Sequence, residues 1–227
     1  MKHIYEGKTK SVFELQDGNY LLKFKDDVTT DKDGKFDPGA NTIGLTIDGA
    51  GRAGLRLTEY LYPRIEASGF PTHFVAADID AATLTVKPAT IIGNGLEVIC
   101  RFRAMGSFLR RYGDYCTEGQ PLDAFAEITL KDDERGDPPI SREAASMLEL
   151  LKEQEYDTLI GLTKNISRLI AKLLAEKGIE LYDIKLEFGR VDGKIALIDE
   201  ISGGSMRAYK NGVYIKPLEL AELVLEE

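Results

Sequence analysis

Hydrophobic and polar residues alternate along the first third of the chain with the period of two that is typical of β-strands. The clearest alternation covers residues 10–15 and 20–24, and residues 17–19 between them, Asp-Gly-Asn, have the composition of a hairpin turn. Two further strands are predicted over residues 83–87 and 96–102. This part of the sequence therefore predicts an antiparallel, β-rich lobe.

The strand pattern is interrupted twice. Residues 26–51 are rich in Gly, Asp and Thr, which favours a mobile loop over a regular element. A helix is predicted over residues 53–67, because Gly69 and Pro71 follow it in the manner of a helix end.

The later part of the chain changes to the longer apolar period of helices. Ser141 can cap a helix that starts at Arg142, and a longer helix is predicted over residues 157–177, closed by Gly178. Two more strands follow, and then a short helix with Pro217 near its first turn.

A length of 227 residues with 43% hydrophobic content allows two small lobes with real cores. We predict an α+β fold with a β-rich N-terminal lobe over residues 1–95 and a mixed α/β C-terminal lobe over residues 96–227.

The charge balance narrows the possible functions. The 29 Lys and Arg residues and 38 Asp and Glu residues give a net charge of −9, which opposes binding to nucleic acid or to an anionic membrane. The sequence opens on charged residues and has no stretch of about 20 apolar residues, so we expect a cytoplasmic protein. Two cysteines and two histidines leave little for disulfides, zinc or a histidine-based triad. Any chemistry must therefore depend on carboxylates, lysines and arginines.

The strongest candidate for such chemistry is a predicted strand over residues 183–189. Alternation places Asp183, Lys185 and Glu187 on one face of this strand and its apolar residues on the other. Residues 195–200 have the pattern of the returning strand, with Asp199 near its end. Converging carboxylates suit Mg²⁺ that also bridges nucleotide phosphates, whereas the alternative interpretation is a solvated face with ordinary ion pairs.

The turn between these two strands decides where Asp199 lies. A three-residue loop that pairs Arg190 with Lys194 would place Asp199 opposite Lys185. A two-residue turn that pairs Val191 with Lys194 would send Asp199 to the other face. The magnesium hypothesis requires the first register.

Two basic segments are weaker candidates. Lys8 and Lys10 follow Gly7 on one face of a predicted strand, where they could contact phosphates or simply lie on an exposed edge. Residues 101–113 contain four arginines around a Gly-Ser pair that can open a helix, and could bind phosphate or form a basic surface stripe.

Taken together, these segments resemble the SAICAR synthetase (phosphoribosylaminoimidazole-succinocarboxamide synthase) family in order and spacing. The resemblance implies a two-lobed fold distantly like those of ATP-grasp enzymes and kinases, and a possible homodimer. The matching segments are Gly7 to Val12, Phe24 to Asp27, Gly69 to His73, Arg101 to Gly113, Lys131 to Arg135, Asp183 to Gly189 and Asp199 to Ser202.

The resemblance also implies roles for individual residues. The ATP site would be formed by Lys8, Thr9, Lys10, Val12, Lys87, Lys131, Glu187 and Asp199, of which Glu187 and Asp199 would hold Mg²⁺. The imidazole ribotide substrate would contact Arg101, Ser107, Asp183, Lys185 and Arg207. Catalytic roles would fall to Lys185, Asp183 and Lys131.

The implied reaction is ATP-dependent joining of the carboxylate of carboxyaminoimidazole ribotide to the amine of L-aspartate through an acyl phosphate. Three segments depart from the family pattern: residues 30–41, residues 135–138, where the usual histidine is Gly136, and residues 202–207, where the usual Ser-Pro-Asp is lost. The tail after Leu218 is also shorter than the family's. A divergent ligase for another acid and amine, a small-molecule phosphotransferase and a non-catalytic binding protein therefore stay open.

Overall fold

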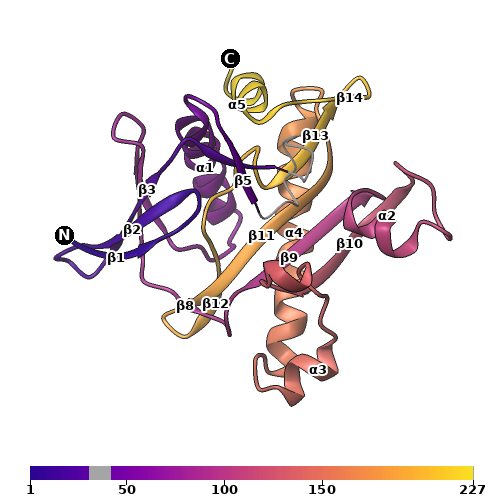
Figure 1. Ribbon diagram of the computed structural model, residues 1–227, viewed down its shortest axis with the longest axis horizontal. Coiled ribbons are helices and arrows are strands. Elements are labelled where there is room, and N and C mark those ends of the chain that lie inside the picture. Colours follow the sequence, from indigo (N-terminus) through magenta and orange to yellow (C-terminus); the bar gives the residue numbers. More distant parts are fainter. Residues whose placement is uncertain (31–41, 227) are drawn as a thin grey trace. The chain divides into compact units, whose positions relative to one another are not determined.

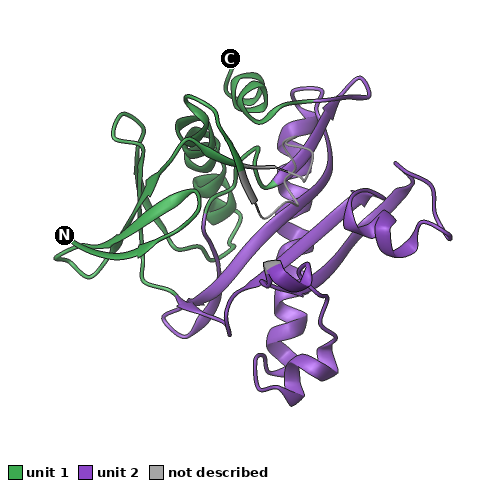
Figure 2. Cartoon of the chain, in the orientation of Figure 1, with its two compact units in different colours: residues 1–89, 200–205, 215–227 green, residues 90–199, 206–214 purple. Residues whose placement is uncertain are grey.

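The computed structural model describes residues 1–30 and 42–226 (Figure 1). The chain forms two compact units (Figure 2). Unit 1 comprises residues 1–89, 200–205 and 215–227, and unit 2 comprises residues 90–199 and 206–214. This division differs from the predicted single cut between residues 95 and 96. The strand Thr90–Ile91 pairs within unit 2, and the chain returns to unit 1 twice after residue 199.

Unit 1 is built on an antiparallel five-stranded sheet with the order β1-β2-β3-β7-β6. Its strands are β1 (Lys2–Glu6), β2 (Lys10–Glu14), β3 (Tyr20–Phe24), β6 (Phe74–Asp78) and β7 (Thr83–Val86). The helices α1 (Ala50–Ala67) and α5 (Pro217–Leu225) pack against each other in this unit. Leu22, Leu55, Leu84 and Val86 form a buried cluster between the sheet and α1, so the predicted β-rich character of this part is confirmed.

Two short strands replace the ends of the loop expected over residues 26–51. Strand β4 (Asp27–Thr30) pairs with β5 (Thr42–Thr46), so the prediction of a loop is wrong for these residues. Their threonines and Ile43 have high β-propensity, and Pro38, which suggested a loop, lies outside both strands. Residues 31–41 lie outside the described residues.

Unit 2 is built on a seven-stranded sheet in which β11 is the central strand. The order is β10-β9-β11-β13-β14, and β8 and β12 also pair with β11. Its strands are β8 (Thr90–Ile91), β9 (Leu96–Arg103), β10 (Pro121–Leu130), β11 (Glu180–Val191), β12 (Lys194–Ile198), β13 (Met206–Lys210) and β14 (Val213–Tyr214). Its helices are α2 (Ser107–Tyr112), the 3₁₀ helix η1 (Asp133–Arg135), α3 (Arg142–Met147) and α4 (Glu153–Ala175).

The two faces of the unit 2 sheet differ in polarity. Helix α4 packs against β9, β10 and β11 (Figure 1). Ile184, Leu186 and Phe188 of β11 are buried, as the predicted alternation requires. Asp183, Lys185 and Glu187 alternate with them and carry the polar groups of β11 to the opposite face.

Helix ends lie close to where the capping residues predicted them. Ser141 Oγ accepts a hydrogen bond of 3.1 Å from the Ala144 N–H at the start of α3. Gly178 follows α4 with a φ of 70°, and Pro217 is in the first turn of α5. Helix α4 begins at Glu153, four residues before the predicted start. Among the described residues, no helix has the length and apolar character that crossing a bilayer would need.

The amino terminus of α4 yields a prediction about stability. The Glu155 carboxylate accepts from the Lys152 N–H at 2.9 Å and from Nε and Nη2 of Arg190 at 2.9 Å each. Arg190 is the main cause of the lowered pKa of Glu155. Because the folded-state pKa lies below its ordinary value of 4.5, the contribution is present above that pH and is lost as the pH falls through the folded pKa.

We therefore expect Glu155→Gln to lower the free energy of unfolding by about 1–2 kcal/mol at pH 7, with a shrinking deficit as the pH falls below about 4. Urea denaturation of both proteins across this pH range measures the difference. Glu153→Gln is the matched control, because Glu153 lies in the same helical turn with an exposed side chain. A deficit of the same size at pH 7 and pH 3 would contradict this account.

Candidate functional site

The β11–β12 hairpin does not have the register that the magnesium hypothesis requires. Val191 pairs with Lys194 and Arg190 with Ile195, so the second of the two alternatives, a two-residue turn, joins the strands. Asp192 and Gly193 both have positive φ values, 50° and 75°. Positive φ at both central residues is typical of the type I′ turn, whose twist matches that of the flanking strands.

Asp199 nevertheless shares a charged partner, Lys131, with Glu187. Strand β12 ends at Ile198, and Asp199 itself has a φ of 64° in the left-handed region. Strand alternation therefore stops before Asp199 and does not determine the direction of its side chain. Burial would lower the pKa of Lys131, but the charges of Glu187 and Asp199 raise it above its ordinary value. Both carboxylates thus act on the same ammonium group.

These groups belong to a set that we call the carboxylate–lysine cluster: Glu97, Lys131, Lys185, Glu187 and Asp199. Lys131 Nζ donates to Glu187 Oε1 at 2.8 Å, and Lys185 Nζ donates to Glu97 Oε1 at 2.7 Å. Glu97 of β9 lies directly opposite Glu187 of β11 in the sheet. Burial raises the pKa of Glu97, while the Lys185 ammonium opposes that rise.

The cluster has three carboxylates and two ammonium groups, and the carboxylate in excess attracts an added cation. Among the described residues no set of three or more Asp, Glu, His or Cys side chains is placed to hold a metal ion. Mg²⁺ differs from zinc in this respect, because it keeps several waters and is commonly bound by one or two carboxylates and phosphate oxygens. Glu187 and Asp199 supply two carboxylates in a cluster with excess negative charge, and this donor set fits Mg²⁺.

A second set, the arginine–carboxylate chain, lies on β9, β10, β11, β13 and α2. It runs Arg207, Asp183, Arg101, Glu127, Arg111, with alternating charges. Asp183 Oδ2 accepts from Arg207 Nη1 at 2.7 Å and from Arg101 Nη1 at 3.2 Å. Glu127 Oε1 accepts from Arg101 Nη2 at 3.0 Å and from Arg111 Nη2 at 2.5 Å. Three guanidinium groups and two carboxylates leave a net positive charge that suits an anionic ligand.

Four of the five residues assigned by resemblance to the ribotide site are linked by successive hydrogen bonds: Arg207 to Asp183, Asp183 to Arg101, and Arg101 to Ser107, whose Oγ accepts from Arg101 Nη2 at 2.8 Å. The fifth, Lys185, lies two positions from Asp183 on the same face of β11. Glu97 could have been identified from the alternation of β9, which puts it on the same face as Arg101. Glu127 could not, because no strand was predicted over its segment.

Gly106 leaves space that the Arg207 guanidinium occupies. Its φ of 54° and ψ of −127° are accessible almost only to glycine, and a Cβ there would lie 3.0 Å from Arg207 Nη1. We expect Gly106→Ala to lower the free energy of unfolding by about 1–3 kcal/mol. Urea denaturation measures the loss. Gly119→Ala is the control, because Gly119 also has a positive φ but an added Cβ would meet nothing within 4 Å. A loss no larger than that of the control would contradict close packing of Arg207 against Gly106.

The residues assigned by resemblance to the ATP site in unit 1 lie mostly on the β1–β2 turn. The Gly7 N–H donates to the Lys10 carbonyl at 2.8 Å and closes this turn, which carries exposed Lys8 and half-buried Thr9. Lys10 forms an ion pair with Glu200, a partner that sequence reasoning did not identify.

Val12 and Lys87 lie apart from that turn. Val12 of β2 packs against the buried cluster of unit 1, and so part of its side chain serves the core. Lys87 follows β7 with an exposed side chain, and its backbone N–H donates to the His73 carbonyl at 2.7 Å.

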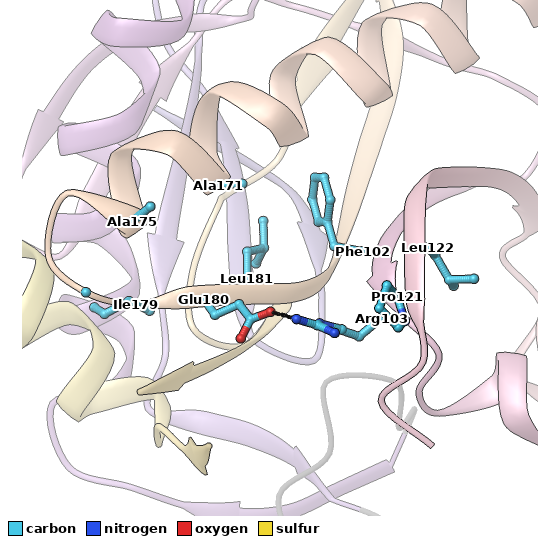
Figure 3. Close-up of a pocket in the computed structure, with 10 residues that line it drawn as sticks. Phe102, Arg103, Pro121, Leu122, Ala171, Ala175, Ile179, Glu180 and Leu181 are labelled. Carbon is cyan, nitrogen blue, oxygen red and sulfur yellow. Dashed lines mark hydrogen bonds and ion pairs between the residues drawn. The ribbon is translucent and has the colours of Figure 1, made fainter. Parts of the chain in front are cut away.

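A separate surface pocket of about 540 Å³ lies in unit 2, where the carboxyl end of α4 meets β9, β10 and β11 (Figure 3). Its lining is largely apolar, and an ion pair between Arg103 and Glu180 lies at its side. None of the residues assigned to ATP, magnesium or ribotide lines this pocket.

Comparison with known proteins gives a single family. The family model for SAICAR synthetase matches residues 3–219. Phosphoribosylaminoimidazole-succinocarboxamide synthase of Clostridium tetani (strain Massachusetts / E88) is 62% identical over the full length of both chains. The enzyme of the same name from Finegoldia magna is 34% identical, over 92% of this chain and 86% of its own.

Solved structures agree with the sequence comparison. A SAICAR synthetase in complex with ADP has a TM-score of 0.85 and 27% identity, covering 98% of this chain and 97% of its own. The phosphoribosylaminoimidazole-succinocarboxamide synthase from Ehrlichia chaffeensis has a TM-score of 0.82 and 27% identity, covering 94% and 88%. The predicted α+β architecture is therefore confirmed, and the chain belongs to the SAICAR synthetase family.

Proposed function

We propose that this chain is an ATP-dependent ligase that joins carboxyaminoimidazole ribotide to L-aspartate and forms SAICAR in purine biosynthesis. The observation that carries this proposal is the 62% identity, over the whole of both chains, to a protein named phosphoribosylaminoimidazole-succinocarboxamide synthase. The fold shared with an ADP complex of a SAICAR synthetase supports the use of ATP.

The reaction has to overcome the poor reactivity of a carboxylate, whose leaving group would be oxide. In the first step a carboxylate oxygen of the ribotide attacks the γ-phosphorus of ATP, and ADP leaves. In the second step the aspartate amine attacks the acyl carbon, phosphate leaves, and the nitrogen loses a proton to a base or to water. The net products are ADP, phosphate and the amide.

The carboxylate–lysine cluster would serve the phosphoryl transfer. Glu187 and Asp199 would hold Mg²⁺, which supplies charge neutralisation for the nucleotide phosphates when it is bound. Lys131 and Lys185 place two ammonium groups beside these carboxylates, where they can stabilise negative charge that develops on the transferred group. Lys8 and Lys10 would contribute further positive charge to the nucleotide from the β1–β2 turn.

The arginine–carboxylate chain would bind the ribotide. Its three guanidinium groups and the Ser107 hydroxyl provide hydrogen-bond donors for a phosphate or carboxylate group of that substrate. Asp183 is shared between two arginines, which fixes the separation of their guanidinium groups. By the same family likeness we propose a homodimer in the cytoplasm, and sedimentation equilibrium would test the oligomeric state.

One assay tests the proposal. The protein is incubated with ATP, Mg²⁺, carboxyaminoimidazole ribotide and aspartate, and ADP and the succinocarboxamide product are measured together. We expect both to form in equal amounts, and neither when the ribotide is omitted. ADP release only with a different acid and amine would select a divergent ligase. A stable phosphoester product would select a phosphotransferase, and nucleotide binding without turnover would select a binding protein.

A further inference from the structure

Glu127 is a buried carboxylate that links two arginines from different elements. It lies on β10 with 8% of its surface exposed. Its Oε1 accepts from Arg101 of β9 at 3.0 Å, and both of its oxygens accept from Arg111 Nη2 of α2 at 2.5 Å. Burial of an ionised carboxylate is costly unless it is fully paired, so this placement requires both guanidinium groups.

Glu127 holds one of the two terminal nitrogens of the Arg101 guanidinium, and Asp183 holds the other. Arg101 is 2% exposed, and its Nη1 donates to Asp183 Oδ2 and to the Met105 carbonyl. Its Nη2 donates to Glu127 and to Ser107 Oγ. Removal of Glu127 would leave Asp183 as the only carboxylate partner that the described residues give to Arg101.

Charge and geometry make opposite predictions for this carboxylate. Neutralising Glu127 raises the net charge of the arginine–carboxylate chain from +1 to +2, and charge alone would then strengthen the binding of an anion. Geometry predicts the reverse, because Arg101 and Arg111 would lose the acceptor that holds them in one arrangement. The direction of the effect therefore separates the two roles.

We propose that Glu127 is a positioning residue for the ribotide substrate. It holds the guanidinium groups of Arg101 and Arg111 so that the arginine–carboxylate chain presents its donors in a fixed arrangement to the anionic part of that substrate. This inference rests on the proposed function, because it takes the ribotide as the ligand of these arginines.

The first variant is Glu127→Gln, which keeps the shape of the side chain and removes its charge. We expect the KM for the ribotide to rise at least about tenfold, while the KM for ATP changes less than about twofold. Glu127→Asp keeps the charge and should recover part of the ribotide KM. Asp123→Asn is the matched control on the same strand, because its side chain is 97% exposed, and it should change neither constant.

The second variant is Arg111→Lys, which keeps the charge but loses the planar fork. Arg111 is 26% exposed, so this variant tests the proposal even where Glu127→Gln does not fold. We expect a similar rise in the ribotide KM. The double variant should show little further increase, because both changes break the same contact.

Calorimetric titration of the ribotide without ATP or aspartate separates this inference from the proposed function. If wild-type protein binds the ribotide but forms no SAICAR, the proposed function fails, while weaker binding by Glu127→Gln still supports the positioning role. An unchanged or tighter ribotide affinity in Glu127→Gln would overturn the inference, as would no ribotide binding by the wild type or fully additive effects in the double variant.

Discussion

Glu187→Gln will lower the rate of SAICAR formation by at least about a hundredfold while the protein stays folded. The amide keeps the size of the side chain but removes one of three negative charges from the carboxylate–lysine cluster. The remaining carboxylates then balance the two lysines, and no charge is left to favour an added cation. Initial rates at saturating ATP and Mg²⁺ measure the loss.

Glu180→Gln is the control for that variant. Glu180 lies on the same strand, β11, but its carboxylate pairs with Arg103 outside the cluster. We expect this control to retain near-normal turnover. If the Glu187→Gln protein had a rate close to that of the control, Glu187 would have no place in the proposed magnesium site.

Asp199→Asn is expected to reduce turnover to a similar extent. Asparagine tolerates the left-handed backbone that Asp199 adopts, with φ of 64°, so the substitution removes the charge without adding strain. Asp199→Gly should be equally inactive, because glycine also suits this backbone but supplies no ligand. Stopped assays of ADP and SAICAR, together with a thermal melt, measure activity and folding.

The control for Asp199 lies in the same hairpin. Asp192 has a φ of 50° at the turn, and Asp192→Asn makes the same chemical change at a comparable backbone conformation. This variant should keep its activity. If Asp199→Gly were active and Asp199→Asn also retained most of its rate, only the backbone conformation at residue 199 would matter.

The sequence predicts elements well where local signals agree with tertiary packing. Strand β11 was predicted from alternation, and the same alternation places its apolar residues on the side that α4 covers. Gly69 and Gly178 have positive φ values just after α1 and α4, so the residues that predicted the helix ends adopt the conformations that end them.

Strand β10 was missed because it lacks regular alternation. Its pairing with β9 shifts register between Pro121 and Phe125, and Ala124 within it has a φ of 46°. A bulge of this kind puts apolar and polar residues out of phase, so a period-two pattern does not appear. Because β10 was not predicted, Glu127 was not among the predicted site residues.

The carboxylate–lysine cluster shows a different limit of sequence reasoning. Glu97 and Glu187 lie directly opposite each other on β9 and β11, which local pairing rules disfavour. The arrangement is stabilised by Lys185 and by Lys131, which comes from a segment far away in the sequence. Only the tertiary fold brings these charges together. Asp199, which acts on the same lysine, has a left-handed backbone that the alternation of β12 does not predict.

Glu187 and Asp199 are central to the proposed mechanism, in which their carboxylates would hold Mg²⁺ together with a nucleotide. Calorimetric titration of ADP with and without Mg²⁺ tests this in the wild type and in the Glu187→Gln/Asp199→Asn double variant. We expect Mg²⁺ to tighten ADP binding at least about tenfold in the wild type and to have almost no effect in the double variant. An equal gain from Mg²⁺ in both proteins would contradict the account.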